Sequence, residues 1–549
     1  MNQKCFRGNP QLLIVCFGLA AQVQAADLIV GFKAGTAGAV RSQVERLGGR
    51  LIEAYPNLNS ARFEAPDSSR DRIAKLAGVT FAAGNSRVEA TSVTPLDYTH
   101  EAMGASAAAT YGFTGRNIGV AVIDSGIFDH DDLKGTDYGN LHIVYTEDFT
   151  GGDGKDHFGH GTHVAGIIAG NGQESTGSGY TYRIRGVAPD VNLLNLRVLD
   201  ADGRGSDSAV IAAIDRAIEL KSTYNVRIIN LSLGRPVTTS CKKDPLCQAV
   251  GAAWKAGIVV LASAGNMGRE NVQGIQGYGT ITVPGNHPSV ITVGASNTNG
   301  TASRGDDKMT SYSSKGPSRF DLTAKPDLVA SGNRVVSLLA ANTTIYNSYS
   351  ANRVPFSLYK PGSSGLSDKY YRLSGTSMAT PVVAGAVALM LEKQPSLTPD
   401  QVKMRLMKTA TKSFAPVSTA ADPVTGQVYT LTNDLFTVGA GNLDIVAALN
   451  DTSVSAKSAA SPTVRYNTAT RAVELVLGNN VVWGTNVIWG TNVIWGTNVI
   501  WGTNVIWGTN VVWGTSSISG FNVIWGTNVI WGTSAPGAAA TDVLINGEN

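Results

Sequence analysis

The sequence predicts an α/β fold in which helices flank a parallel β-sheet. Between about residues 115 and 449, apolar runs rich in β-branched residues alternate with stretches of helical spacing. Strands that are buried on both faces have this composition, and the alternation is typical of a parallel sheet. The runs are NIGVAVID, VNLLNLRVLD, VRIINLSLG, GIVVLASAG and SVITVGAS. In such a sheet, functional side chains gather at the carboxyl ends of the strands.

The length and composition indicate a chain of several globular units. At 549 residues the chain exceeds one ordinary core, and about two to four units are expected. The formal net charge is only +3. Because there is no strong excess of positive charge, we expect no nucleic-acid partner.

Residues 1–25 have the pattern of a secretory signal peptide. Lys4 and Arg7 form a basic start, residues 11–21 form a short apolar run, and Val23-Gln24-Ala25 suits a signal peptidase. The apolar run is too short to anchor the chain across a bilayer. We therefore expect a secreted protein that is extracellular or attached to the cell surface.

Residues 26–95 are expected to form a small α+β unit. Residues 27–33 have a strand pattern, and two helix-like runs end at Gly48-Gly49 and at Gly78. About sixty residues give only a marginal hydrophobic core, so this unit is expected to lean on a partner.

Two cysteines lie beyond the predicted signal peptide: Cys241 follows the helix-like stretch 206–224, and Cys247 begins the helix-like stretch 247–257. Cys241 and Cys247 are expected to close a small disulfide loop in an oxidising compartment. The alternative is two free thiols. A zinc site would need two more ligands nearby, and this segment has none.

A polar linker at residues 450–478 precedes a six-residue repeat at 479–534 and a tail at 535–549. The unit N-V-[IV]-W-G-T contains eight of the nine tryptophans. A period of six would scatter them around a helix, so we expect short strands joined by Gly-Thr-Asn turns in a β-rich tail. Self-association and binding of cell-surface polysaccharide are the functions expected of it, and a disordered low-complexity tail is the alternative.

Three histidines lie three residues apart in the stretch HFGHGTHVAG. A metal site is disfavoured, because no HExxH pattern or nearby cysteine is present. In a helix, His157 and His163 would also point about 240° apart. Gly159 and Gly161 flank only His160 and permit a close approach there. We therefore predict no metal ligand, and His160 is the candidate base at the entrance of a buried helix.

Further candidates lie at the ends of predicted elements. Asp124 ends the first strand run, and Asn266 follows a later one. Ser377 lies near the start of the buried helix predicted within residues 374–393, where Pro381 suits a first turn. Each residue alone has an ordinary explanation as a helix cap or a turn residue.

Together these residues supply what acyl transfer needs. The reaction requires a nucleophilic hydroxyl, a base that titrates near neutrality, a carboxylate that orients the base, and donors for the developing oxyanion. In that order, the candidates are Ser377, His160, Asp124 and Asn266.

The same residues lie in motifs that resemble the signature blocks of the subtilisin-like serine peptidases, the subtilases. The blocks are Asp124-Ser125-Gly126, His160-Gly161-Thr162-His163-Val164-Ala165-Gly166 and Gly375-Thr376-Ser377-Met378-Ala379-Thr380-Pro381, in that family's Asp, His, Ser order. Ala264-Gly265-Asn266 resembles the family's oxyanion block. The resemblance implies a subtilisin-like peptidase domain over residues 96–449.

This resemblance implies a serine endopeptidase that cleaves proteins and peptides through an acyl-enzyme and needs no catalytic cofactor. Asp124 would orient His160, and Ser377 would be the nucleophile beside the oxyanion donor Asn266. Substrate would lie as an added strand between two edges. The substrate-binding edges are Ser232-Leu233-Gly234 and Gly203-Arg204-Gly205.

Residues 26–95 resemble the family's inhibitory propeptide, with self-cleavage between about 90 and 105. The protein would then be a zymogen with its own propeptide as an intramolecular inhibitor. The alternative is a fixed accessory domain. A second hypothesis for the whole chain is a cell-surface or assembly protein, in which the tryptophan repeat is the functional module and the peptidase is accessory.

Two segments depart from the family's pattern. Asp132 aligns with a family calcium ligand, but residues 171–186 replace the loop that supplies most ligands of that site. The sequence therefore gives no support for a structural calcium ion, although one is possible. Residues 341–373 are longer than in compact members, and we expect either a substrate-facing insertion or an inert loop.

Overall fold

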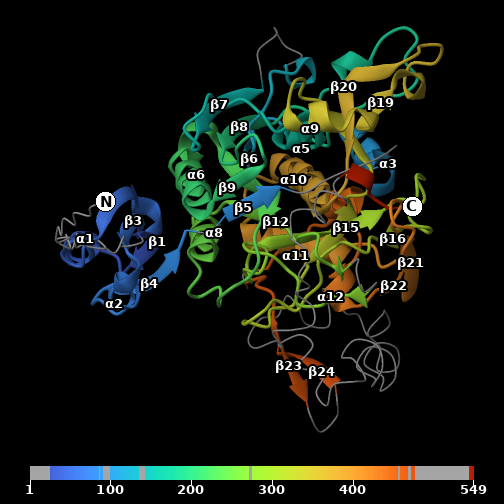
Figure 1. Cartoon of the computed structure of the whole chain (residues 1–549). Coiled ribbons are helices and arrows are strands. Elements are labelled where there is room, and N and C mark those ends of the chain that lie inside the picture. The colour runs from blue at the N-terminus through green and yellow to red at the C-terminus, as the bar shows by residue number, and fades with distance from the viewer. Residues whose placement is uncertain are drawn as a thin grey trace, which may run out of the picture.

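The computed structural model describes residues 25–85, 87–90, 99–134, 142–270, 275–455, 458–467, 472–476, 543 and 545–548 (Figure 1). The predicted signal peptide, except for residue 25, and the repeat at 479–534 lie outside these ranges. Within them, no helix is both long and apolar enough to span a bilayer.

The N-terminal residues fold into a small α+β domain with its own core. Its strands form an antiparallel sheet in the order β2-β3-β1-β4, within the residues for which the sequence predicts a small α+β unit. Val40 and Val44, one helical turn apart, are buried against the sheet residues Leu28, Val30 and Phe63. The elements are β1 Ala25–Phe32, α1 Ala37–Arg46, β2 Arg50–Tyr55, β3 Ser60–Pro66, α2 Arg70–Ala74 and β4 Val79–Gly84.

A mostly parallel sheet forms the centre of the large domain, in the order β16-β15-β12-β10-β6-β8-β7, with β17 beside β15. All five predicted strand runs are present, and they pair in parallel with one another in the order β15-β12-β10-β6-β8. The one antiparallel pair is β15 with β16. The strands are β6 Gly119–Asp124, β7 Ile143–Asp148, β8 Asn192–Arg197, β10 Val226–Leu231, β12 Val259–Ser263, β15 Ile291–Asn297, β16 Lys308–Met309 and β17 Leu328–Ser331.

Helices cover both faces of this sheet (Figure 1). The amphipathic helices α6 (Asp207–Glu219) and α8 (Pro245–Lys255) pack together on one side. On the other side, α10 (Thr376–Lys393) runs along β10, β12, β15 and β17 and packs against α5 (His160–Ala169). Residues 376–391 of α10 are buried and uncharged, as expected of a helix that is enclosed all round.

Smaller sheets surround the core. A three-stranded sheet joins β11 (Leu233–Gly234), β5 (Arg87–Ala90) and β9 (Arg204–Ser206), and is described below. The remaining elements include α11 Pro399–Thr409, α12 Leu435–Val438, α13 Ile445–Asn450, and the paired strands β18 Val335–Leu338, β19 Arg353–Pro355 and β20 Leu366–Leu373. The hairpins are β21 Val417–Ala421 with β22 Val428–Thr432, and β23 Thr463–Asn467 with β24 Ala472–Val476.

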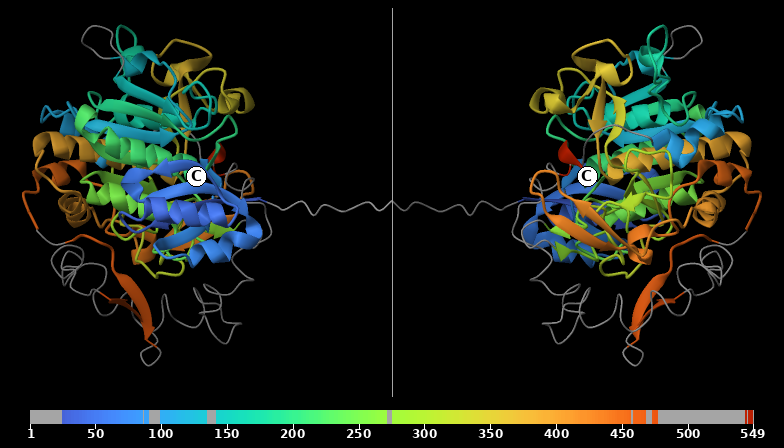
Figure 2. Two further views of the ribbon diagram at one scale, coloured as in Figure 1. Left: turned by 90° about the vertical axis from the view of Figure 1, so that its left-hand side faces the viewer. Right: turned by 90° about the vertical axis from the view of Figure 1, so that its right-hand side faces the viewer.

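The interval expected to be a linker contains packed structure. Ala459 and Ser461 are buried, and the Val464 N–H donates to the carbonyl of Leu322 at 2.8 Å. Within this interval, β24 pairs antiparallel with β23. Residues 459–464 are therefore attached to the large domain, and the two turned views in Figure 2 show the β23–β24 hairpin projecting beneath it.

Candidate active site

Asp124 lies at the carboxyl end of the central strand β6, where sequence reasoning placed it. Its Oδ1 accepts hydrogen bonds from the Ser125 N–H at 2.8 Å and from His160 Nδ1 at 2.7 Å. Both side chains are almost fully buried. Donation from Nδ1 leaves Nε2 as the basic nitrogen of a neutral imidazole, which is the tautomer that a general base needs.

The N-terminus of α5 holds His160 close to β6. Gly159 has φ +105°, which other residues adopt only with strain. A Cβ at Gly161 would collide with the carbonyl oxygen of Gly126 and contact Asp124. The two glycines around His160 thus allow the close approach that their pattern predicted.

The other two histidines have separate surroundings. His157 is half exposed and lies 2.8 Å from Asp153. His163 is buried within α5, where burial lowers its pKa to about 3 and its Nε2 lies 3.3 Å from the carbonyl of Tyr371. Within the described part of the chain, no group of His, Cys, Asp and Glu side chains is arranged to hold a metal ion.

Asp156, which sequence reasoning missed, organises this helix start. Its buried carboxylate accepts bonds from three backbone N–H groups and two hydroxyls. The donors are Phe158 N at 3.1 Å, Gly159 N at 2.7 Å, Thr162 N at 2.9 Å, Thr162 Oγ1 at 2.7 Å and Ser125 Oγ at 2.9 Å. Burial raises the pKa of Asp156, and these bonds act against that shift. The signal that could have identified Asp156 in the sequence is its place shortly before the start of a predicted helix, where aspartate often accepts bonds from free backbone N–H groups.

Ser377 lies in the first turn of α10, as expected. Its Oγ donates to the carbonyl of Ser232 at 2.9 Å, while Ser232 Oγ donates to the carbonyl of Ser377 at 2.8 Å. Pro381 lies inside α10 rather than in its first turn, which corrects the expectation from the sequence. Because proline has no N–H, Pro381 cannot make the usual helical bond to Ser377, and the Ser232 hydroxyl replaces it.

Asn266 follows β12 and faces the start of α10. Its Oδ1 accepts from the Thr376 N–H at 2.9 Å and from Thr376 Oγ1 at 3.0 Å. Asn266 is 8% exposed, and among the described residues its Nδ2 has no partner. A buried amide donor without a partner beside Ser377 is suited to an oxyanion.

The predicted substrate edges lie on either side of a strand from the N-terminal residues. β5 pairs antiparallel with β11 through Leu233↔Ala90 and Gly234↔Glu89. It also pairs antiparallel with β9 through Val88↔Gly205 and Glu89↔Arg204. Gly203 precedes this edge in a turn with φ +72°. The two predicted substrate edges are therefore already bridged by an added strand of the kind expected for substrate.

The calcium position suggested by the resemblance does not fit a cation. Asp132 is buried, and its two carboxylate oxygens accept from the Glu174 N–H at 2.7 Å and from the Tyr370 hydroxyl at 2.6 Å. Lys369 lies 3.2 Å from Asp131 and 3.6 Å from Glu174. Protein donors and a lysine thus occupy the oxygens that a calcium ion would need.

Two further sequence features are located by the structure. Cys241 and Cys247 form the expected disulfide. The insertion at 341–373 packs against the loop before His160: Thr344 N donates to the carbonyl of His157 at 3.0 Å, and Ile345 N to that of Phe158 at 3.0 Å. The insertion therefore supports the loop that leads into α5.

This arrangement of a strand-end aspartate, a helix-start histidine and a helix-start serine agrees with comparisons to known proteins. The profile of the Subtilase family matches residues 115–442. The chain belongs to the subtilase family. It is therefore a serine-type endopeptidase of the subtilisin kind, as the motifs predicted.

Individual subtilases resemble this chain over different lengths. Serine protease AprX of Bacillus subtilis is 38% identical over 308 residues, which span 55% of this chain and 62% of AprX. Subtilisin E of Bacillus subtilis is 32% identical over 388 residues, 70% of this chain and 84% of that subtilisin. The chain thus spans less than two thirds of AprX and most of subtilisin E.

A solved structure shares the fold. Fervidolysin from Fervidobacterium pennivorans, described as a keratinolytic enzyme related to subtilisin, superposes with a TM-score of 0.58 at 21% identity. The match covers 80% of this chain and 62% of fervidolysin. At this identity the likeness concerns the fold alone.

Proposed function

We propose that this subtilase is a secreted endopeptidase, made as a self-processing zymogen, in which Asp124, His160, Ser377 and Asn266 perform the catalysis. The observation that supports this assignment best is the buried 2.7 Å hydrogen bond from His160 Nδ1 to Asp124. The predicted signal peptide and the Cys241–Cys247 disulfide support export to an oxidising compartment.

Each residue has a defined role in the proposed reaction. His160 Nε2 removes the proton from Ser377 Oγ as the oxygen attacks the scissile carbonyl, and Asp124 stabilises the imidazolium that forms. Asn266 Nδ2 and the backbone N–H of Ser377 donate to the developing oxyanion. His160 then gives its proton to the leaving amine, and a water molecule hydrolyses the acyl-enzyme by the reverse sequence.

Replacement of the nucleophile tests this assignment. Ser377→Ala is expected to abolish hydrolysis of casein and labelling by a fluorophosphonate. Ser348→Ala, at an exposed serine of the insertion, is the matched control and should keep both. Labelling that persists in Ser377→Ala would refute the assignment.

The small domain is proposed to be the inhibitory propeptide, because β5 fills the substrate cleft and the domain body rests on α6. Asn85 Oδ1 accepts from the Ser208 N–H at 2.6 Å in the first turn of α6, and its Nδ2 donates to Ser208 Oγ at 2.7 Å. Tyr55 donates to the carbonyl of Ser208 at 3.3 Å. The small domain therefore contacts the start of α6 and, through β5, the proposed substrate cleft.

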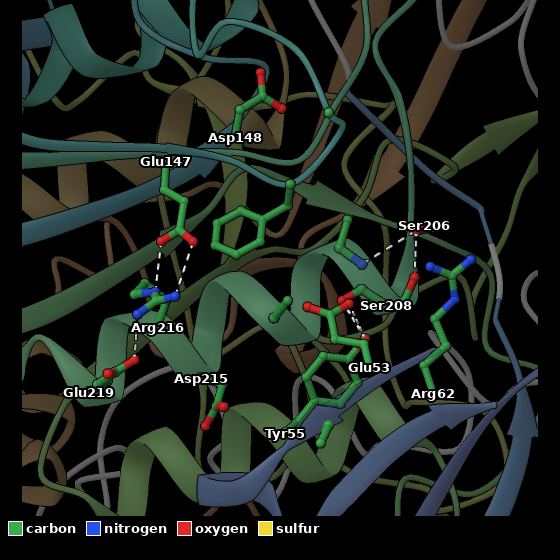
Figure 3. A pocket seen from close by; sticks show the side chains of 15 residues that line it. Glu53, Tyr55, Arg62, Glu147, Asp148, Ser206, Ser208, Asp215, Arg216 and Glu219 are labelled. Atoms are coloured by element: carbon green, nitrogen blue, oxygen red, sulfur yellow. Dashed lines mark hydrogen bonds and ion pairs between the residues drawn. The ribbon is translucent and has the colours of Figure 1, made fainter. Parts of the chain in front are cut away.

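A polar pocket lies beside this contact (Figure 3). Glu53, Tyr55 and Arg62 of the small domain line it together with residues of β7 and α6. On the α6 side, Arg216 is paired with Glu147 at 2.7 Å and with Glu219 at 2.7 Å. These ion pairs lie within the large domain and do not cross to the small domain, so this part of the boundary between the two domains is a polar pocket rather than a packed apolar contact.

N-terminal sequencing tests self-processing. The mature chain of the parent protein is expected to begin between about residues 90 and 105, whereas secreted Ser377→Ala protein should keep the small domain. An identical processed N-terminus in both proteins would show that another protease makes the cut, and would favour a fixed or externally processed domain.

The second hypothesis, in which the repeat is the functional module, is tested by deleting residues 479–534. We expect the deletion to change surface retention or self-association and to leave peptidase activity intact. Loss of soluble activity would place the repeat in the catalytic fold instead.

A further inference from the structure

The chain beyond the repeat returns to the peptidase domain. Val543 is 3% exposed and packs in the main core, and Ile545 packs against the same core. Glu548 is 1% exposed. Figure 1 shows this segment in red beside β15 and β16, well apart from the β23–β24 hairpin that precedes the repeat.

Glu548 occupies a site in which its side chain and its backbone are both bound. The carboxylate is paired with Arg269 at 2.5 Å and accepts from the Ser311 N–H at 2.9 Å and from the Ser311 hydroxyl. Its backbone N–H donates to Asn333 Oδ1 at 3.0 Å, and its carbonyl accepts from Asn333 Nδ2 at 3.0 Å. This arrangement binds one acidic residue through both its side chain and its backbone.

The charge of the site is balanced without the segment. Arg269 is also paired with Asp422 at 2.5 Å, and both side chains of this pair are nearly fully buried. Removal of Glu548 therefore leaves Arg269 with a partner, whereas removal of Arg269 would leave two buried carboxylates without a cation. Variants at Glu548 are consequently the ones expected to fold.

We propose that residues 543–548 are an intramolecular ligand of the site formed by Arg269, Ser311 and Asn333, and that the tryptophan repeat is therefore held at both ends. The other end is attached through the Val464–Leu322 backbone bond and through Ser461 Oγ, which donates to Asp327 at 2.6 Å. A single cut inside the repeat then leaves both pieces bound to the peptidase.

The site also contacts the loops around the proposed nucleophile and oxyanion donor. Arg269 lies three residues after Asn266, and Gly268 N donates to the carbonyl of Tyr312 at 2.8 Å. Gly332, next to Asn333, accepts from the Gly375 N–H at 2.6 Å. The segment thus joins two loops that approach the start of α10 from different strands.

A cut-and-retain experiment tests the proposal without peptidase activity. In a Ser377→Ala chain, the degenerate repeat copy at residues 516–521 is replaced by the recognition sequence of an unrelated site-specific protease, and the folded chain is cut. Native gel filtration then measures how much of the fragment from 522 to 549 elutes with the larger piece. We expect nearly complete co-elution, at least a tenfold loss for Glu548→Ala, and an intermediate loss for Glu548→Gln.

Asp368→Asn, which removes an exposed carboxylate of the insertion, is the charge-matched control and should retain the fragment. Each chain is cut only after a cooperative melting transition shows that it is folded, so that misfolded protein is not scored. A fragment that separates from the parent chain, or that stays bound in Glu548→Ala, would overturn the proposal. The second outcome would show that Glu548 does not make the attachment.

Discussion

Ser377 and Ser232 exchange hydrogen bonds: each hydroxyl donates to the other residue's carbonyl, at 2.9 and 2.8 Å. The pair joins the first turn of α10 to the Ser232-Leu233-Gly234 edge that is proposed to bind substrate. The Ser232 hydroxyl takes the place of the N–H that Pro381 lacks, which in an ordinary helix would donate to the Ser377 carbonyl.

Ser232→Ala is expected to lower the free energy of unfolding by about 1–3 kcal/mol, since it leaves the buried Ser377 carbonyl without a donor. Urea denaturation of the Ser377→Ala chain measures this without self-digestion. In a Pro381→Ala background the helix regains its own N–H, so the cost of Ser232→Ala should shrink. An undiminished cost in that background would contradict this explanation.

Asp156→Asn is expected to destabilise the chain by about 3 kcal/mol, because an amide NH₂ would face donors that now share a carboxylate. If Asp156 positions His160, kcat should fall while KM changes little. Asp153→Asn, at a half-exposed carboxylate three residues away, should stay within about 0.5 kcal/mol. Equal losses of unfolding free energy in Asp156→Asn and Asp153→Asn would contradict the role assigned to Asp156.

Acid should destabilise the fold below pH 6.5. Burial lowers the pKa of His130 to about 4 and that of His163 to about 3, from an ordinary value of 6.5. The unfolded chain therefore binds more protons between pH 6.5 and these values, so the stability present above pH 6.5 is lost as the pH falls. At pH 5 each histidine contributes a loss of about 2 kcal/mol.

Denaturant titrations at pH 7.5 and pH 5 measure this loss. His163→Gln, which cannot titrate, should reduce the difference between the two pH values, whatever its effect on stability at pH 7.5. A pH dependence that is unchanged in this variant would exclude His163 as a source.

Chelation of calcium should leave the melting temperature of the chain unchanged. The reason is that protein donors already bond to both carboxylate oxygens of Asp132. Tyr370→Phe should cost about 1–3 kcal/mol by removing one of those donors. Scanning calorimetry of the parent chain with EDTA and with added calcium measures the effect of chelation, and calorimetry of Tyr370→Phe measures the loss of the donor. A lower melting temperature in EDTA would show that a cation stabilises the chain.

Much of the site could be predicted from local sequence. Asp124 and Asn266 follow apolar strand runs, and parallel strands bring their carboxyl ends to one edge. His160 stands between two glycines, and Ser377 opens a long uncharged stretch. Asp156, Tyr370 and Glu548 were not predicted, because each is defined by partners that are distant along the chain.

By itself, the sequence determined the alternation of strands and helices and the order of the motif blocks, since periodicity and glycine placement are local properties. Only the tertiary structure decided which groups satisfy the buried charges. Asp156 meets Ser125 across 31 residues, and Glu548 meets Ser311 across 237. A buried carboxylate must find donors wherever the fold brings them, and no pattern within one segment records that choice.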